Sequence, residues 1–437
     1  MATGKEMARR IFQQTLASID IPHVMERKLP REGTRLILPD GVIDLSQIGN
    51  IYVVAIGKAA HAMVRGLEDL LPPDTRVAGI VVAPVAPERP ARGMEYFVGG
   101  HPVPNADSWR SAEAILQLLR NCDERTLVIF LLSGGGSALC ELPLDGEMRL
   151  GDVQAVNRAL VTCGAPIEAM NTVRKHFSAV KGGRLALAAG NAKKITLAVT
   201  DVPAGKESAL ASGPTLPDPS TIADVERIVE QYDLRKKFPE RLVKWLDAGE
   251  MPETPKSGDA AFANAHFQLL LGMDDLFHAA HHAAEACGYA TCCDNSTDDW
   301  PVVKAVDALL EQLGEWQRQN DGQRVALIAD GELSSPVTGD GVGGRNSAFV
   351  LDVAGKIAGR RITVLSAGTD GIDGNSPASG AVADGETVER ARAAGLDREK
   401  AFRESDAYTF FEKLGDAIVT GPTGNNLRDL RILLAEG

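Results

Sequence analysis

Short apolar runs that lead into glycine and then into a helical pattern recur along the first half of this chain, and they constrain its fold most strongly. The runs are IYVVAI (51–56), VAGIVVA (77–83), TLVIFLL (126–132) and KITLAV (194–199). Strands rich in β-branched residues and apolar on both faces are typical of a parallel sheet covered by helices. The first half is therefore predicted to be a series of βαβ units.

The second half repeats the strand and helix alternation. Further strands are predicted near RVALIAD (324–330), RITVLSA (361–367) and AIVTG (417–421), with a last helix after them. The stretch from about 220 to 260 is charged and contains prolines, a pattern that predicts short exposed helices and a linker-like segment. Because 437 residues exceed the usual size of one core, we expect two α/β domains, at 1–235 and 255–437.

Composition narrows the class of protein. A net charge of −13 argues against a surface that binds nucleic acid or anionic lipid. The first twenty residues form an amphipathic pattern rather than a signal peptide, and no apolar run approaches the roughly 20 residues of a membrane helix. The six cysteines have no zinc-site spacing, so we expect reduced thiols and a cytoplasmic protein without nucleic-acid or membrane partners.

The most suggestive turn is Ser133-Gly134-Gly135-Gly136-Ser137, directly after the run 126–132. Three glycines let the backbone fold back, and successive N–H groups before a helix can bind phosphate or carboxylate. A tight turn in which glycine only relieves a steric clash is equally compatible with this sequence. The chain has no GxxxxGK[ST] motif, so this is not a Walker A loop.

Charged residues follow several other strands. Lys58 comes after Gly57 at an expected helix N-terminus, where a lysine is disfavoured unless an anion joins it. Asp201 follows the run 194–199 after Thr200 and suits a general base, a magnesium ligand or a turn cap. The segment 171–186 is a basic cluster, which is either an anion site or a solvated helix face.

In the second half, Gly339 to Gly344 match GxGxxG formally. Eight loop residues separate the strand from the first glycine of the motif, so we reject a dinucleotide fingerprint. The loop instead presents Arg345, which suits a bidentate grip on a carboxylate or phosphoryl group. Two further glycine loops, at 366–385 and 420–426, are weak candidates for closing over a nucleotide or metal, and His278, His281 and His282 are interpreted as an ordinary helix face.

Taken in order, IGKAA, GGHPVPNADS, SGGGSALCELP, NTVRKHFSAVKGGRLA, ASGPTLPD, GELSSPVTGDGVGGRN, GTDGIDG and TGPTGNN resemble the glycerate 2-kinase family, over about 8 to 434. The resemblance implies a Rossmann-like α/β/α N-terminal domain, a C-terminal α/β MOFRL domain, and an active site in the cleft between them. It also implies ATP-dependent phosphorylation of D-glycerate to 2-phosphoglycerate and ADP with Mg²⁺. The oligomeric state stays open.

The family motifs carry a site assignment onto this sequence. The catalytic residues implied are Lys58, Asp201 and Arg345, and Asp201 is also the one metal-ligand candidate. The substrate- and phosphate-binding residues assigned are Ser133, Gly134, Gly135, Gly136, Ser137, Asn171, Arg174, Lys181, Ser212, Gly213, Gly343, Gly344 and Asn346. The nucleotide-binding residues assigned are Glu332, Asp370, Asp373, Gly374, Thr423 and Asn425.

In the working mechanism, Asp201 accepts the proton of the 2-hydroxyl while Lys58 and Arg345 balance charge on the carboxylate and the transferring phosphoryl group. The sequence departs from the family at Ala204 to Glu207, which puts a metal role of that loop in doubt, and at Ser347-Ala348 beside Arg345. The alternative enzyme is an NAD(P)H-dependent hydroxypyruvate reductase. The non-catalytic alternative is a protein that senses sugar acids.

Overall fold

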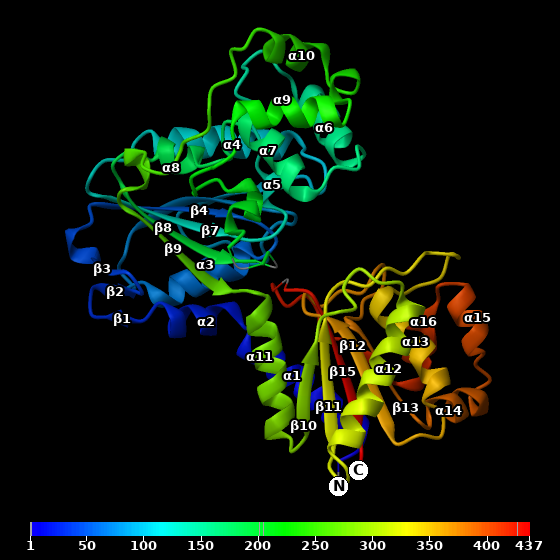
Figure 1. Cartoon of the computed structure of the whole chain (residues 1–437). Coiled ribbons are helices and arrows are strands. Elements are labelled where there is room, and N and C mark those ends of the chain that lie inside the picture. The colour runs from blue at the N-terminus through cyan, green and yellow to red at the C-terminus, as the bar shows by residue number, and fades with distance from the viewer. Residues whose placement is uncertain (1, 201, 204, 426) are drawn as a thin grey trace. The chain divides into compact units, whose positions relative to one another are not determined.

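The chain divides into two compact units, shown in the computed structural model of Figure 1. The structure describes residues 2–200, 202–203, 205–425 and 427–437. We call Ile21–Gly272 the parallel-sheet unit, and Met1–Asp20 together with Met273–Gly437 the mixed-sheet unit. The predicted α/β class is confirmed in both.

A six-stranded parallel sheet with the order β6-β5-β4-β7-β8-β9 forms the centre of the parallel-sheet unit. Its strands are β4 (Asn50–Ile56), β5 (Val77–Ala83), β6 (Met94–Val98), β7 (Thr126–Leu132), β8 (Lys193–Val199) and β9 (Ala265–Leu271). From β4 the chain continues outward through β5 and β6 to one edge of the sheet. It then returns to β7, beside β4, and continues outward through β8 and β9 to the other edge. The strand order therefore reverses between β4 and β7, the position where open α/β sheets place their ligands.

Helices cover both faces of this sheet, as predicted for an α/β/α sandwich. In Figure 1, α2 (Ile21–Lys28) and α3 (Ala60–Leu70) lie on one face, and α4 (Ala106–Leu119) and α8 (Arg184–Ala188) lie on the other. The remaining elements are β1 (Arg31–Glu32), β2 (Arg35–Leu38), β3 (Gly41–Asp44), α5 (Gly136–Leu139), α6 (Leu150–Val161), α7 (Ile167–Phe177), α9 (Ile222–Gln231), α10 (Glu240–Asp247), and the 3-10 turns η1 (Leu45–Gln47), η2 (Glu207–Ser212), η3 (Leu234–Lys236) and η4 (Ala260–Phe262).

The segment predicted as short exposed helices and a linker does contain helices, but they pack in a cluster. Helices α6, α7, α9 and α10 share one apolar core, to which Val225, Leu242 and Leu246 contribute from the charged stretch. The charged residues lie on the outer faces of strongly amphipathic helices, a pattern that composition alone does not separate from a linker. The compact units divide at 272/273 instead of between 235 and 255.

The mixed-sheet unit contains the second six-stranded sheet, with the order β10-β11-β15-β12-β13-β14. Its strands are β10 (Ala290–Asp294), β11 (Val325–Asp330), β12 (Ile362–Gly368), β13 (Gly380–Asp384), β14 (Ala417–Ile418) and β15 (Asp429–Ala435). Only β10 and β11 pair in parallel among these strands, whereas β15 lies antiparallel between β11 and β12. The last helix expected after residue 420 is thus wrong, because that segment forms a central strand.

Helices also cover both faces of the mixed sheet. In Figure 1, α1 (Gly4–Ser18) and α11 (Met273–Ala286) pack on one face, and α12 (Val302–Gln319) and α13 (Arg345–Lys356) pack on the other. Beside α13 lie α14 (Thr387–Ala393), α15 (Arg398–Arg403) and α16 (Ala407–Leu414). None of the helices in the described ranges is long and apolar enough to cross a membrane.

Helix α1 belongs with the C-terminal part of the chain, although the predicted boundaries place it in the first domain. A capping box of Thr3 and Glu6 starts the helix. Its apolar stripe, with Ala8, Ile11 and Phe12 buried, packs on β12, β13, β15 and α11. The amphipathic pattern therefore predicts the helix correctly, but it does not specify the sheet on which the helix packs.

Candidate functional site

The loops after β4 and β7 interlock at the point where the strand order reverses. The N–H of Lys58 donates to the carbonyl of Gly134 at 2.9 Å, and the N–H of Ala59 donates to Ser133 Oγ at 3.0 Å. Gly57 has φ +134°, and a Cβ there would lie 2.1 Å from Ser133 Oγ. Only glycine fits this close approach, which fixes the backbone of Lys58 against the glycine turn.

The glycine turn leaves its backbone donors open. Among the described residues, the N–H groups of Gly134, Gly135, Gly136 and Ser137 have no hydrogen-bond acceptor. Gly135 has φ +84° and precedes the short helix α5. Adjacent unpaired N–H groups in such a turn form a concavity that binds anions. This observation favours the anion-binding interpretation of the triple glycine over the purely steric one.

A lysine and a histidine pack over the same turn. A Cβ at Gly135 would lie 3.0 Å from His101 Cδ2 and 3.5 Å from Lys58 Cγ. Partial burial lowers the pKa of His101, and the nearby Lys58 ammonium lowers it further. No carboxylate pairs with Lys58 among the described residues. Within the described ranges, an exposed cation without a counter-ion therefore lies beside N–H groups that have no acceptor.

His101 was missed in the sequence-based site assignment. It follows β6 within the motif GGHPVPNADS, so the signal was present: a polar residue after a strand of the same sheet. Residues after neighbouring parallel strands meet at the same edge of the sheet. To predict that His101 lies near Gly135, one must know the strand order, which places β6 on the same side of β7 as β4.

Helix α7 delivers two predicted residues to this edge. Ser212 Oγ donates to Asn171 Oδ1 at 3.0 Å and also bonds to Ser137 Oγ at 2.9 Å. Arg174 donates to Asn157 Oδ1 at 3.0 Å, and burial lowers the pKa of its guanidinium. The structure thus brings Asn171, Ser137 and Ser212 together in one hydrogen-bonded chain.

Ser212 is held by an unusual backbone. Ala211, Ser212 and Gly213 have φ of 49°, 59° and 62°, although only glycine adopts this region without strain. The carbonyls of Ser212 and Gly213 accept hydrogen bonds from the consecutive glycines Gly182 and Gly183. Strain that persists because surrounding contacts enforce it is characteristic of functional loops.

Lys181 has a different environment from Lys58. Its side chain is 1% exposed, and its Nζ donates to Glu141 Oε2 at 2.6 Å and to the carbonyl of Cys140 at 3.1 Å. Glu141 is 4% exposed and also accepts from Ser178 Oγ at 2.6 Å. A buried ammonium that is paired with a carboxylate ties the segment after α5 to the glycines at 182 and 183.

The predicted base Asp201 lies outside the described residues. Thr200, just before it, is buried, and its N–H donates to the carbonyl of Leu271 at 2.9 Å. This fixes the end of β8 at the same edge of the sheet as Lys58 and the glycine turn.

Arg345, at the start of α13 in the mixed-sheet unit, is paired with two carboxylates. Its Nη1 donates to Glu332 Oε2 at 2.9 Å, and its Nε donates to Asp429 Oδ2. Burial alone would lower the pKa of Arg345, but Asp429 and Glu332 outweigh burial and raise it. Asp429 is 5% exposed, whereas Glu332 is 48% exposed. Asp429 is thus the fixed partner and Glu332 the exchangeable one.

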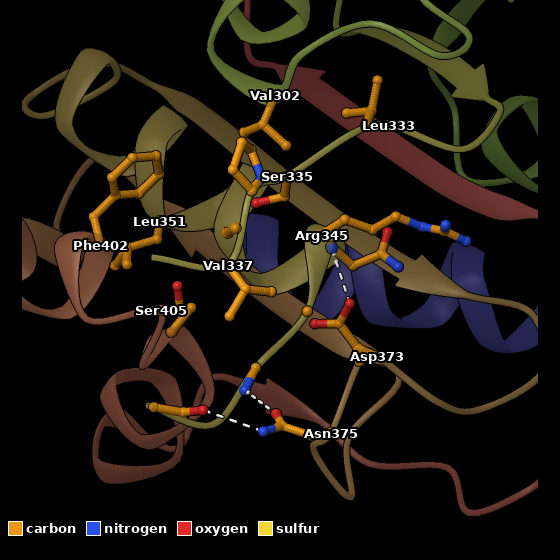
Figure 2. Close-up of a pocket in the computed structure, with 18 of the residues that line it drawn as sticks. Val302, Leu333, Ser335, Val337, Arg345, Leu351, Asp373, Asn375, Phe402 and Ser405 are labelled. Carbon is orange, nitrogen blue, oxygen red and sulfur yellow. Dashed lines mark hydrogen bonds between the residues drawn. The ribbon is translucent and has the colours of Figure 1, made fainter. Parts of the chain in front are cut away.

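The glycine loop before Arg345 is closed by side chains of the same unit. Asp373 accepts from the N–H groups of Asn346 and Ser347, each at 2.9 Å, as Figure 2 shows in part. The N–H of Gly343 donates to Asn375 Oδ1 at 2.8 Å, and that of Gly344 to Ser347 Oγ at 3.1 Å. The N–H groups of Gly343, Gly344 and Asn346, predicted to bind phosphate, are therefore already engaged.

This loop borders a pocket of about 810 Å³. In Figure 2, Leu351 and Phe402 lie on one side of the pocket, Arg345 and Asp373 on the other, and Val337 between them. Three residues predicted to bind nucleotide line it, namely Asp370, Asp373 and Gly374. The other three are not among its lining residues: Glu332 accepts from Arg345, Thr423 donates to the carbonyl of Thr369, and Asn425 donates to the carbonyl of Ile19.

A buried carboxylate, Asp330, ends β11 and was not predicted as part of the site. It is 1% exposed, and neither of its oxygens has a hydrogen-bond partner in the described part of the chain. Burial raises its pKa to about 6, opposed by nearby Arg428 and Arg431. Two guanidinium groups disfavour a divalent cation there.

The described residues contain no group of three or more histidine, cysteine or acidic side chains that could hold a metal ion. Magnesium in nucleotide enzymes is commonly held by substrate phosphates and only one or two carboxylates. The described residues are compatible with magnesium that arrives with a nucleotide, and they identify no protein ligand for it.

Comparisons with known proteins agree along the whole chain. Residues 7–247 match a domain of unknown function, DUF4147, and residues 325–429 match the MOFRL family. A glycerate 2-kinase of Pyrococcus horikoshii is 33% identical over 88% of this chain and 87% of its own length. A D-glycerate 2-kinase of Thermotoga maritima is 32% identical over 93% of this chain and 96% of its own length.

A relative from Agrobacterium vitis, with a provisional hydroxypyruvate reductase name, is 36% identical over 99% of this chain and 94% of its own length. The crystal structure of the Thermotoga maritima glycerate kinase superposes with a TM-score of 0.84 at 32% identity, covering 99% of both chains. The motifs, the two matched domains and these relatives agree, and the chain belongs to the glycerate 2-kinase family with its C-terminal MOFRL domain.

Proposed function

We propose that this chain is a glycerate 2-kinase, which transfers the terminal phosphoryl group of ATP to the 2-hydroxyl of D-glycerate and yields 2-phosphoglycerate and ADP. The observation that carries the proposal is the exposed Lys58 beside the open N–H groups of Gly134 to Ser137. Relatives over most of the chain are named glycerate 2-kinases, which supports the same reaction.

We assign D-glycerate to the edge of the parallel sheet. The carboxylate of glycerate suits the N–H groups of Gly134 to Ser137, where hydrogen bonds to a full negative charge are strong. Lys58 balances the remaining charge, and Ser137 offers a hydroxyl to the substrate, positioned by the buried Ser212. Asp201 is proposed as the group that accepts the proton of the 2-hydroxyl.

We assign the nucleotide to the mixed-sheet unit. Arg345 is the cation for its phosphates, held in place by Asp429. Magnesium, bound with the nucleotide, would neutralise charge on the phosphoryl group. Phosphoryl transfer depends mainly on positioning and on neutralising charge, and Lys58 and Arg345 supply the charge from the protein side.

Lys181 and Arg174 are proposed to position the site rather than to contact glycerate. Lys181 is buried in its pair with Glu141, so an anion would have to displace a carboxylate to reach it. Arg174 bonds to Asn157, whose Nδ2 donates to the carbonyl of Pro102, next to His101. Both therefore support loops of the glycerate site.

The structural argument against the reductase alternative lies at the glycine loop 339–344. A dinucleotide pyrophosphate binds the free N–H groups at the start of a helix. The corresponding N–H groups of α13 are occupied by the buried carboxylate of Asp373. A second anion there would be repelled.

The test is the kinetics of Lys58→Met with ATP and D-glycerate, followed by ADP formation. Loss of a charge-assisted contact should lower kcat/KM for glycerate by about 10- to 100-fold. Lys244→Met removes an exposed lysine that pairs with exposed Glu240, and it should leave the kinetics unchanged. Wild-type protein that oxidises NADH with hydroxypyruvate and forms no ADP from glycerate would refute the proposal.

A further inference from the structure

We propose that the pocket of the mixed-sheet unit binds the purine base of the nucleotide on its apolar side, at Leu351 and Phe402, with the phosphates directed to Arg345. The inference rests on the proposed function, because it assumes a nucleotide donor. It names the base-binding residues, none of which is among the residues assigned from the sequence.

The pocket has the size of a nucleotide site. Its volume of about 810 Å³ lies within the range of about 300 to 1,000 Å³ typical of small-molecule pockets. D-glycerate alone would fill only a small part of it. A nucleoside triphosphate, with a flat apolar end and an anionic end, matches both its size and its division into two chemically different sides.

Several elements build the apolar side. Leu351 comes from α13 and Phe402 from α15, while Val302 begins α12 and Leu333 and Val337 belong to the loop after β11 (Figure 2). Val337 is 83% exposed, an unusual state for a valine that lines a pocket. A bound base would cover Val337 and Phe402, and burying that apolar surface favours binding.

On the opposite side, phosphate is favoured at the side chain of Arg345 rather than at the backbone N–H groups of the first turn of α13. The N–H groups of Asn346 and Ser347 are held by Asp373, so the helix terminus already carries a negative charge. Arg345 lies on the same side in Figure 2. Its Nη1 is bound to the half-exposed Glu332, which a phosphate can replace at small cost.

Hydrogen-bonding groups for the edge of a base lie between the two sides. Ser335 lines the pocket near Val302 and carries a hydroxyl that can donate and accept (Figure 2). Two hydrogen bonds fix the end of the loop 335–338, because Thr338 donates through its hydroxyl to the carbonyl of Arg403 and through its N–H to Ser405 Oγ. A fixed loop with one adaptable hydroxyl suits recognition of a planar heterocycle.

The test compares two probes in calorimetric titrations of the full chain: ADP, which has a base, and inorganic tripolyphosphate, which has none. Phe402→Ala should weaken ADP binding by about tenfold and leave tripolyphosphate binding within twofold of wild type. Val337→Asn, at an exposed position that does not threaten folding, should weaken ADP binding in the same selective way, by about threefold. Arg345→Met should weaken both probes.

A matched control is Val161→Asn, which changes a valine of α6 that is 62% exposed in the other unit. It should leave both titrations unchanged. If neither pocket variant alters ADP binding while wild type phosphorylates glycerate, the base binds elsewhere and this inference is wrong. If the variants weaken ADP selectively while glycerate is not phosphorylated, the base site stands and the proposed reaction fails. Wild type that does not bind ADP would refute both.

Discussion

Replacing Lys181 should destabilise the glycerate site without a direct loss of substrate contact. Lys181 and Glu141 are 1% and 4% exposed and form an ion pair of 2.6 Å. Lys181→Met would leave the Glu141 carboxylate buried and without its counter-ion. Removing one partner of such a pair costs about 3 to 5 kcal/mol.

Cys140 reports this loss directly, because its carbonyl accepts a hydrogen bond from Lys181 and the residue is 3% exposed. Burial raises the pKa of the Cys140 thiol to about 12, so the closed state does not react with iodoacetamide, which attacks thiolates. Alkylation therefore requires local opening. At about 1.4 kcal/mol per tenfold, Lys181→Met should accelerate alkylation of Cys140 by about 100-fold or more, measured by peptide mass spectrometry.

Two further variants make the test specific. Lys181→Met combined with Glu141→Gln removes both charges and should return the rate to within about tenfold of wild type. Lys244→Met, in an exposed pair with Glu240, should change the rate by no more than about twofold. The reasoning is refuted if Lys181→Met leaves Cys140 protected and instead raises KM for glycerate, because Lys181 would then be a substrate contact.

Three other perturbations have defined outcomes. The pKa of Asp330 is about 6 in the folded chain against 3.8 normally, so the folded state binds the carboxyl proton more tightly than the unfolded state does. Asp330 therefore lowers the free energy of unfolding as the pH rises from 3.8 to about 6. Relative to wild type, the free energy of unfolding of Asp330→Asn, measured in urea titrations, should therefore rise by about 2 kcal/mol between pH 4.5 and 7.5. Parallel pH profiles of the two proteins would contradict this. Glu332→Gln removes a competitor for Arg345 and should lower KM for ATP by up to about fivefold, whereas a rise would make Glu332 a nucleotide contact. Gly57→Ala, which forces a Cβ against Ser133 Oγ, should lower kcat/KM by about 100-fold, whereas Gly146→Ala, with open space around it, should not.

The parallel sheet was predictable because its strands are apolar on both faces, a pattern with few other solutions. The residues after β4 and β7 could be recognised as candidate site residues, because glycine and lysine directly after a buried strand are conspicuous. The order of the strands could not be predicted, because it is set by long-range pairing. His101 was therefore missed, although its motif had been noticed.

The mixed sheet was harder to predict. Residues 429–435 are buried at every position, and such a run cannot be distinguished from a buried helix by periodicity. The pairing of Asp373 with the start of α13 joins residues 26 and 27 positions apart, which no local pattern encodes. Gly343, Gly344 and Asn346 were consequently predicted to bind phosphate, whereas in the structure their N–H groups donate to side chains of the same unit.

The most direct test of the central claim is ³¹P NMR of wild-type protein incubated with D-glycerate, ATP and Mg²⁺. We expect stoichiometric ADP and 2-phosphoglycerate, and product signals that grow about 10- to 100-fold more slowly in the Lys58→Met variant at subsaturating D-glycerate. A product phosphorylated at the 3-hydroxyl would contradict the assigned regiochemistry. Unchanged ATP and glycerate would contradict the proposed function as a whole.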